Sequence, residues 1–254
     1  MANTLVEPLG PHEFSQEGYA EAFSLVKKRL SPAWLKSTQD AAATGDPGAA
    51  YLYSIVLRYC AAAPENLDIA SRKMDGYLRL LEENPGLESS MQWIEESVLF
   101  KAEHCQGLPP RRERIARSFD WFVAAADGGH MLAMLSFYKD AIRQYHELFI
   151  RNPDMLYAFH ERSREYINRL LETGHPEAFE LMALAIHQDI VFQYDGVRSL
   201  AFLLVANQQG LPQMSTPWSL QDEIESTLSI EQQRLARELA DEICERYCVV
   251  SAYD

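Results

Sequence analysis

Residues 121–133, with the sequence WFVAAADGGHMLA, determine the fold that we expect for the chain. An alanine-rich helical run ends at Gly128 and Gly129, and a second apolar run begins at Met131. Glycine is typical of a helix end because it adopts the left-handed backbone conformation at little cost. The stretch therefore predicts two successive helices joined by a tight turn.

Versions of this junction recur along the chain. Three glycines are each followed, four positions later, by an alanine: Gly45 and Ala49, Gly129 and Ala133, Gly174 and Ala178. More degenerate junctions occur at Gly86 and Gly210, so successive junctions are roughly 40 residues apart, a period typical of solenoids built from helix pairs. Alanine at the fourth position lets two helix backbones approach closely.

These junctions, with linkers such as residues 106–109, resemble the Sel-one-like repeat family, a relative of the tetratricopeptide repeat. That family's pattern ends one helix with Ala-Ala-x-x-Gly, continues with Asp, His or Asn, and places an alanine three residues later. Residues 118–133 match the pattern best and residues 170–185 next, within a degenerate resemblance over 30–215. The resemblance implies an α/α superhelix that scaffolds protein partners, and it implies no active site.

We therefore predict an all-α fold, a right-handed α/α superhelix (a solenoid of antiparallel helix pairs) that forms one helical-repeat domain over 1–254. It would contain an N-terminal lead-in and capping helix (1–30), degenerate repeats (31–215) and C-terminal capping helices (216–254). Ser229 and Gln232 have the spacing of a capping box. The helix that follows is expected to turn one face inward: Leu235, Ala236, Leu239, Ala240, Ile243 and Tyr247.

Charge and cysteine content limit the classes of partner and compartment. The formal net charge of -14 repels phosphate backbones and anionic lipid head groups, so we expect neither nucleic acid nor membrane as a partner. The first residues lack a signal-peptide pattern, and no apolar run is long enough to span a membrane. Four cysteines at no repeating interval, Cys60, Cys105, Cys244 and Cys248, predict free thiols in a cytoplasmic protein. Export without a cleaved signal stays open.

Motifs for catalysis or metal binding are incomplete. The His-Glu dipeptides at 146–147 and 160–161 lack the second histidine that a zinc protease helix needs. Cys244 and Cys248 could touch a soft metal, but no further ligand lies nearby in the sequence. His104 and Cys105, a possible base and nucleophile, are adjacent and point in different directions on a helix. We expect no enzyme activity and no cofactor; the alternative is a hydrolase whose carboxylates converge in one concavity.

Two groups of residues are candidates for binding a partner. Large side chains occur where the repeat register predicts the face away from the hairpin core: Tyr51, Arg58, Leu135, Tyr138, Ile142 and His187. Tyrosine and arginine suit a binding groove, and packing between neighbouring repeats is the alternative. The basic run Arg111, Arg112 and Arg114 is a candidate docking point for an acidic partner, and pairing with neighbouring acidic helices is its alternative.

The function that we expect is non-catalytic: a scaffold, adaptor or regulator that binds another protein through the concave face of the solenoid. One alternative is a bacterial immunity protein, an inhibitor that binds and blocks a toxic partner. Another is a structural homo-oligomer held by repeat edges. The sequence leaves the oligomeric state open between a monomer and a weak dimer.

Overall fold

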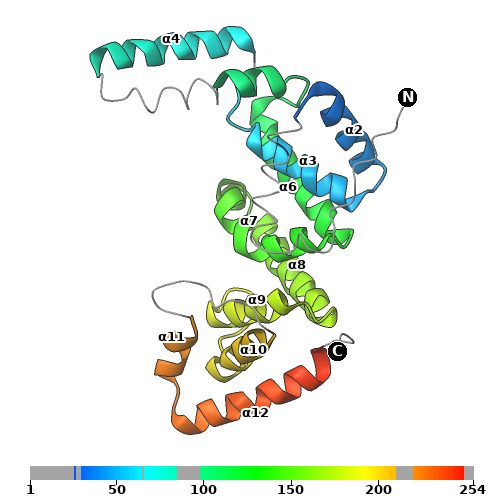
Figure 1. The fold of residues 1–254 in the computed structure, drawn as a ribbon, viewed down its shortest axis with the longest axis vertical. Helices are drawn as coiled ribbons and strands as arrows, with labels where there is room; N and C mark the ends of the chain where they lie inside the picture. The colour runs from blue at the N-terminus through cyan, green and yellow to red at the C-terminus, as the bar shows by residue number, and fades with distance from the viewer. Residues whose placement is uncertain (1–25, 27–29, 65, 85–97, 210–219, 249–254) are drawn as a thin grey trace. The chain divides into compact units, whose positions relative to one another are not determined.

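The computed structural model describes residues 26, 30–64, 66–84, 98–209 and 220–248, and every regular element within them is helical (Figure 1). The protein is all-α, as predicted. In chain order the helices are α2 (Pro32–Ala43), α3 (Pro47–Tyr59), α4 (Leu67–Glu83), α6 (Arg111–Asp127), α7 (Met131–Arg151), α8 (Pro153–Glu172), α9 (Pro176–His187), α10 (Gly196–Gln208), α11 (Leu220–Thr227) and α12 (Ile230–Tyr247). Residues 98–104 are also helical.

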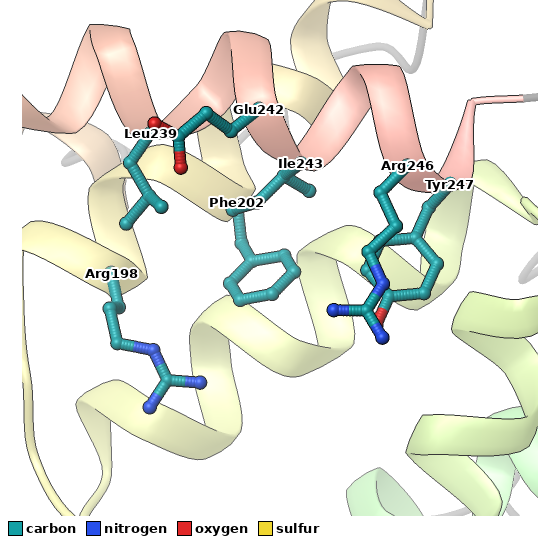
Figure 2. A pocket seen from close by; sticks show the side chains of 7 residues that line it. All are labelled: Arg198, Phe202, Leu239, Glu242, Ile243, Arg246 and Tyr247. Atoms are coloured by element: carbon teal, nitrogen blue, oxygen red, sulfur yellow. The ribbon is translucent and has the colours of Figure 1, made fainter.

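The chain divides into two compact units, Met1–Ala133 and Met134–Asp254. In the first unit, α3 packs against α2 and α6, and its residues 49–57 are all buried. In the second unit, α10 packs against α9, α11 and α12; Figure 2 shows side chains between α10 and α12. A helix that is apolar on all sides is a central helix, so α3 and α10 form the cores of their units.

Three of the predicted junctions are present as helix turns. The φ angle is positive at each glycine: 94° at Gly45, 88° at Gly129 and 68° at Gly174. Each glycine N–H donates to a carbonyl at the end of the preceding helix: Ala42 at 3.0 Å, Ala126 at 3.0 Å and Leu171 at 2.9 Å. The junctions predicted at residues 86 and 210 lie outside the described residues.

The residue after each glycine caps the following helix. The Asp46 Oδ1 atom accepts from the Ala49 N–H at 2.8 Å, and His130 Nδ1 accepts from the Ala133 N–H at 3.3 Å. His175 Nδ1 accepts from the N–H of Glu177, also at 3.3 Å. The repeated Asp or His after the glycine is therefore explained by helix capping, since a side-chain acceptor satisfies an N–H that has no partner within the helix.

Two of these junctions lie side by side in the first unit. A Cβ placed on Gly128 would lie 2.9 Å from the Cβ of Pro47, and one on Gly48 would lie 3.9 Å from the His130 ring. The two adjacent glycines thus have different roles: Gly128 permits the close approach and Gly129 takes the positive φ. The principal partner of α3 is correspondingly α6, and not α4, the next helix in the chain.

Replacing Gly45 by alanine isolates the cost of the positive φ. A Cβ at Gly45 would meet nothing within 4 Å, so Gly45→Ala is expected to lower the free energy of unfolding by about 1 to 2 kcal/mol through backbone strain alone. Gly76→Ala is the matched control, because a Cβ at this position within α4 also meets nothing, and alanine favours a helix. Urea denaturation measures the free energy of unfolding of both variants. An equal loss of stability in Gly45→Ala and Gly76→Ala would contradict the strain argument.

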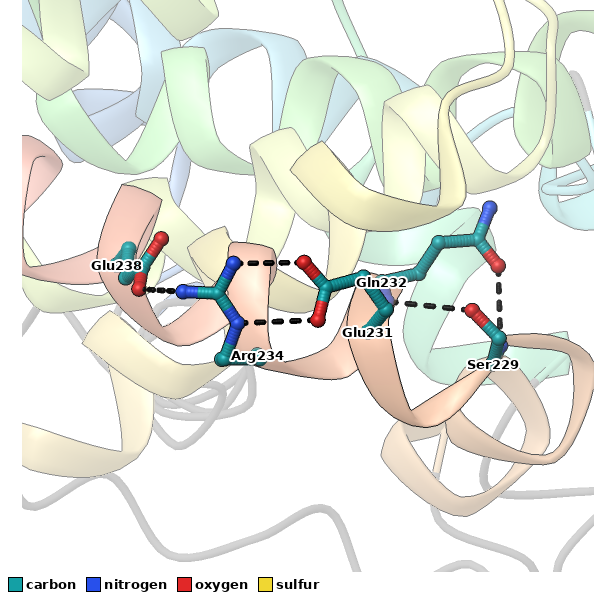
Figure 3. Close-up of polar contacts among 5 residues, drawn as sticks. All are labelled: Ser229, Glu231, Gln232, Arg234 and Glu238. Carbon is teal, nitrogen blue, oxygen red and sulfur yellow. Dashed lines mark hydrogen bonds and ion pairs between the residues drawn. The ribbon is translucent and has the colours of Figure 1, made fainter.

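The capping box predicted at Ser229 is confirmed, and Ser31 caps the start of α2. The Ser31 Oγ atom accepts from the Trp34 N–H at 3.3 Å, with a proline in the first helical turn. In the capping box of α12, the Gln232 N–H donates to Ser229 Oγ at 3.3 Å, and the Ser229 N–H donates to Gln232 Oε1 at 2.9 Å (Figure 3). Arg234, one turn further on, donates to Glu231 at 2.6 and 3.1 Å and pairs with Glu238.

The inward face predicted for α12 is confirmed at three positions, and Leu239 and Tyr247 are half-buried. Ala236, Ala240 and Ile243 are buried, whereas Leu235 is 43% exposed. α12 packs on α10 along a narrow stripe of residues three and four apart, and Leu235 lies about 100° around the helix from Ala236. At the other end of the chain, most of the lead-in and capping helix predicted over 1–30 lies outside the described residues, although Val26 and Leu30 are buried.

The prediction of free thiols is wrong. Cys60 and Cys105 form a disulfide with their Cα atoms 5.8 Å apart, and so do Cys244 and Cys248, with Cα atoms 4.7 Å apart. Cys60 follows α3 and Cys105 follows the helical residues 98–104, so the fold brings together two cysteines 45 positions apart. The second pair is four residues apart at the end of α12, where both side chains lie on one face.

Among the described helices, none has both the length and the apolar composition that crossing a bilayer requires.

Candidate functional site

Tyr51, a candidate binding residue, is buried inside the first unit. Its ring stacks on that of His130 with centroids 4.6 Å apart, and the Phe122 ring lies 6.2 Å away. Arg58, on the last turns of α3, is half-buried. Tyr51 therefore packs inside the protein, at the contact between the Gly45 and Gly129 junctions, and does not line an open binding groove.

His130 is held neutral at this contact. Burial lowers the pKa of His130 to about 4, and the nearby Asp46 carboxylate raises it in part. The neutral ring also suits the cap, because Nδ1 must stay unprotonated to accept the Ala133 N–H. Protonation is therefore expected to weaken both the Tyr51 stack and the start of α7.

Stability is expected to fall with acidification because of His130. The folded-state pKa lies below the ordinary value of 6.5, so this stability is complete above pH 6.5 and is lost as the pH falls towards 4. We expect a loss of about 3 kcal/mol by pH 4, relative to a His130→Asn variant whose amide oxygen can still cap the helix. Urea denaturation between pH 4 and 7 measures the difference. Equal pH dependence of stability in the wild-type protein and in His130→Asn would contradict this prediction. His146→Asn, a substitution at an exposed position, is the control.

Two arginines of the basic run donate to backbone carbonyls at and near the end of α3. Arg114 is 4% exposed and donates from Nη1 to the Cys60 carbonyl at 2.7 Å and from Nε to the Pro109 carbonyl at 2.8 Å. Arg111 Nε donates to the Ala61 carbonyl at 3.2 Å. The exposed Arg112 has its Nε 3.9 Å from a Glu113 carboxylate oxygen. Of the three arginines predicted to dock a partner, only Arg111 and Arg112 are exposed on the surface.

The candidate residues of α7 are partly or fully buried, and one of them contacts the residue that follows α9. Leu135 and Tyr138 of α7 are buried, and Ile142 is half-buried. The Tyr138 hydroxyl donates to Gln188 Oε1 at 2.7 Å, and burial raises the pKa of Tyr138 to about 12. Tyr138 therefore holds Gln188, the residue that follows α9, in place through this hydrogen bond.

His187 lies on the last turn of α9 and is half-buried. Its Nε2 atom is 3.3 Å from Glu223 Oε1 of α11, and its ring centroid is 6.1 Å from that of Tyr194. The structure thus brings Tyr138 and His187 to the start of the connection between α9 and α10, residues 188–195.

This connection is an ordered loop that exposes apolar side chains. Asp189 has a positive φ of 54°, and its Oδ1 accepts from the Tyr194 N–H at 2.7 Å. Arg164 of α8 donates to the carbonyl of the buried Val191 at 2.9 Å. Ile190 and Tyr194 are nevertheless 41% and 46% exposed. We call His187, Ile190 and Tyr194 the α9–α10 loop face.

Sequence reasoning missed Ile190 and Tyr194 because it searched the helical register, and both residues lie between helices. The signal that could have found them is the apolar and aromatic content of residues 190–194, in a connection without proline or glycine. Apolar side chains held outward on an ordered loop are typical of binding surfaces.

The catalytic candidates do not assemble. Cys105 is in a disulfide, and His104 stacks on Phe100 with its Nδ1 2.9 Å from the Phe100 carbonyl oxygen. In the part of the chain that the structure describes, no His, Cys, Asp and Glu side chains group as metal ligands. Carboxylates come together at Glu177 and Glu180 of α9, where burial raises the pKa of Glu177, Lys139 lowers it and Glu180 raises it.

The site and fold define an all-α protein with an ordered apolar loop and a repeated helix-turn geometry. Comparison with models of known protein families, with curated proteins and with solved structures gives no match. The Sel-one-like resemblance is therefore carried only by the residues of the junctions themselves.

Proposed function

We propose that the protein binds another protein without catalysis, as a scaffold, adaptor or regulator, and that the α9–α10 loop face belongs to its binding surface. The observation that carries this proposal is the exposure of Ile190 and Tyr194 on a loop fixed by Asp189 and Arg164. Tyrosine buries a large area with a polar tip on binding, and a fixed loop loses little entropy.

The proposal includes a right-handed α/α superhelix of the Sel-one-like kind. Its support is the common geometry at Gly45, Gly129 and Gly174, where a positive-φ glycine precedes a capping side chain. The direct contact between the first two junctions further supports stacked helix pairs. In this arrangement, residues 60–110 would be an insertion between successive pairs, since α3 packs on α6.

The test is capture of partners by the intact protein, with mass spectrometry of what it retains. We expect a specific set of proteins to be retained and then lost from an Ile190→Ser/Tyr194→Ser variant. The matched control is Ile150→Ser/Tyr157→Ser, which removes the same residue types from exposed positions 77% and 70% accessible. Loss of the same proteins from both variants, or from neither, would contradict a role for the loop face.

A further inference from the structure

The second unit has a hollow between α10 and α12. It encloses about 230 Å³ and is lined by seven residues: Arg198, Phe202, Leu239, Glu242, Ile243, Arg246 and Tyr247. Phe202 and Ile243 are buried and form an apolar floor with the half-buried Leu239 (Figure 2). The hollow thus offers apolar contact area that the helices themselves leave accessible.

Two arginines stand at the rim of this hollow. Arg198 of α10 and Arg246 of α12 are exposed, and their guanidinium groups lie on either side of the Phe202 ring in Figure 2. The Arg246 guanidinium lies 5.0 Å from the centroid of the Tyr247 ring. Within the described residues, neither arginine pairs with a carboxylate. In a protein with a net charge of -14, two such arginines around an apolar floor favour an anionic group on the ligand.

Glu242 also lines the hollow and limits where that anion can bind. Its carboxylate lies near Leu239, on the side opposite Arg246 and Tyr247 in Figure 2. Repulsion by Glu242 disfavours an anion on its own side, so an incoming carboxylate would bind towards Arg246.

The size of the hollow indicates what kind of ligand it takes. Sites for whole drug-sized molecules usually enclose about 300 to 1,000 Å³, and this hollow is smaller and open to solvent. It suits one apolar side chain that a larger molecule presents, with a charged group remaining at the rim.

We infer that the hollow binds an apolar side chain of a partner polypeptide together with an adjacent carboxylate, which Arg246 holds. The inference rests on the proposed protein-binding function and specifies an acidic, apolar segment of the partner. The floor selects the apolar side chain, and the Arg246 guanidinium group selects the carboxylate.

Two blocked hexapeptides test the inference on the full chain. One contains leucine followed by glutamate among glycine and serine residues, and the other contains leucine followed by glutamine. Titration followed by NMR shifts of α10 and α12 amides gives each affinity. We expect the glutamate peptide to bind about tenfold more tightly, because only it forms charge-assisted hydrogen bonds with Arg246.

Variants of the rim separate charge recognition from folding. Arg246→Gln is expected to weaken binding of the glutamate peptide about tenfold and to leave the glutamine peptide unchanged. Glu242→Gln is expected to strengthen binding of the glutamate peptide severalfold, because it removes a like charge. Arg237→Gln, an exposed arginine of α12 outside the hollow, is the control and should change neither affinity.

Equal affinity for the two peptides, or no shifts in α10 and α12, would overturn the inference. Shifts with octanoate but with neither peptide would also overturn it, since they would assign the hollow to a small amphiphile. Such failures would leave the dependence of partner capture on Ile190 and Tyr194 intact. They are therefore distinguishable from failure of the proposed function.

Discussion

Replacing Cys60 and Cys105 together by serine is expected to lower the free energy of unfolding by about 4 kcal/mol. The disulfide joins residues separated by 45 positions, and removing it releases the entropy of that long loop in the unfolded chain. Both sulfur atoms are buried, so the serine hydroxyls would add a desolvation cost in the folded state. Urea denaturation without reductant measures the difference.

The second disulfide is the internal control. Cys244→Ser/Cys248→Ser opens a loop of only four residues at the end of α12, so the expected loss is about 2 kcal/mol, half as large. If both double variants lost the same stability, loop closure by Cys60 and Cys105 would not be the cause. Reductant added to the wild-type protein should reproduce the sum of the two losses.

Arg114→Met is expected to cost about 3 to 5 kcal/mol. The substitution keeps an apolar stem but removes two charge-assisted hydrogen bonds, each worth about 1.5 to 3 kcal/mol. It also leaves the buried Cys60 carbonyl and the half-buried Pro109 carbonyl without this donor. Thermal and urea denaturation should both show the loss.

Arg112→Met, two residues earlier, is the matched control. Its side chain is 86% exposed, so the expected change lies within about 0.5 kcal/mol. A small effect of Arg114→Met would contradict the role of its guanidinium at the end of α3. Arg114 donates to the carbonyl of Cys60 itself. The losses in free energy of unfolding caused by Arg114→Met and by Cys60→Ser/Cys105→Ser should therefore not be additive.

The turns at Gly45, Gly129 and Gly174 could be predicted because they depend on local chemistry. A positive φ favours glycine, a side-chain acceptor at the next position caps the following helix, and a small residue permits close packing. The Ser229 capping box could be predicted for the same reason, since its two hydrogen bonds join residues three apart.

The rest depends on contacts between residues far apart in the sequence. Arg114 donates to a carbonyl 54 positions away, and no helical periodicity predicts that partner. The Cys60–Cys105 pairing likewise requires the end of α3 to meet residues 98–104. The helical register places Tyr51 and Tyr138 away from the hairpin core and leaves binding and packing as alternatives, because their contacts, His130 and Gln188, come from other parts of the chain.

The pairing of α3 with α6 also has a consequence for biosynthesis. The nine consecutive buried residues of α3, 49–57, find their main cover only when α6 has been made, as far as Asp127. At about 5 to 20 residues per second, the ribosome would need roughly 3 to 14 seconds to add that stretch after Tyr59. During this interval α2 alone, among the described helices that pack on α3, would be available to cover it, so the side chains that α6 later buries would remain exposed to water.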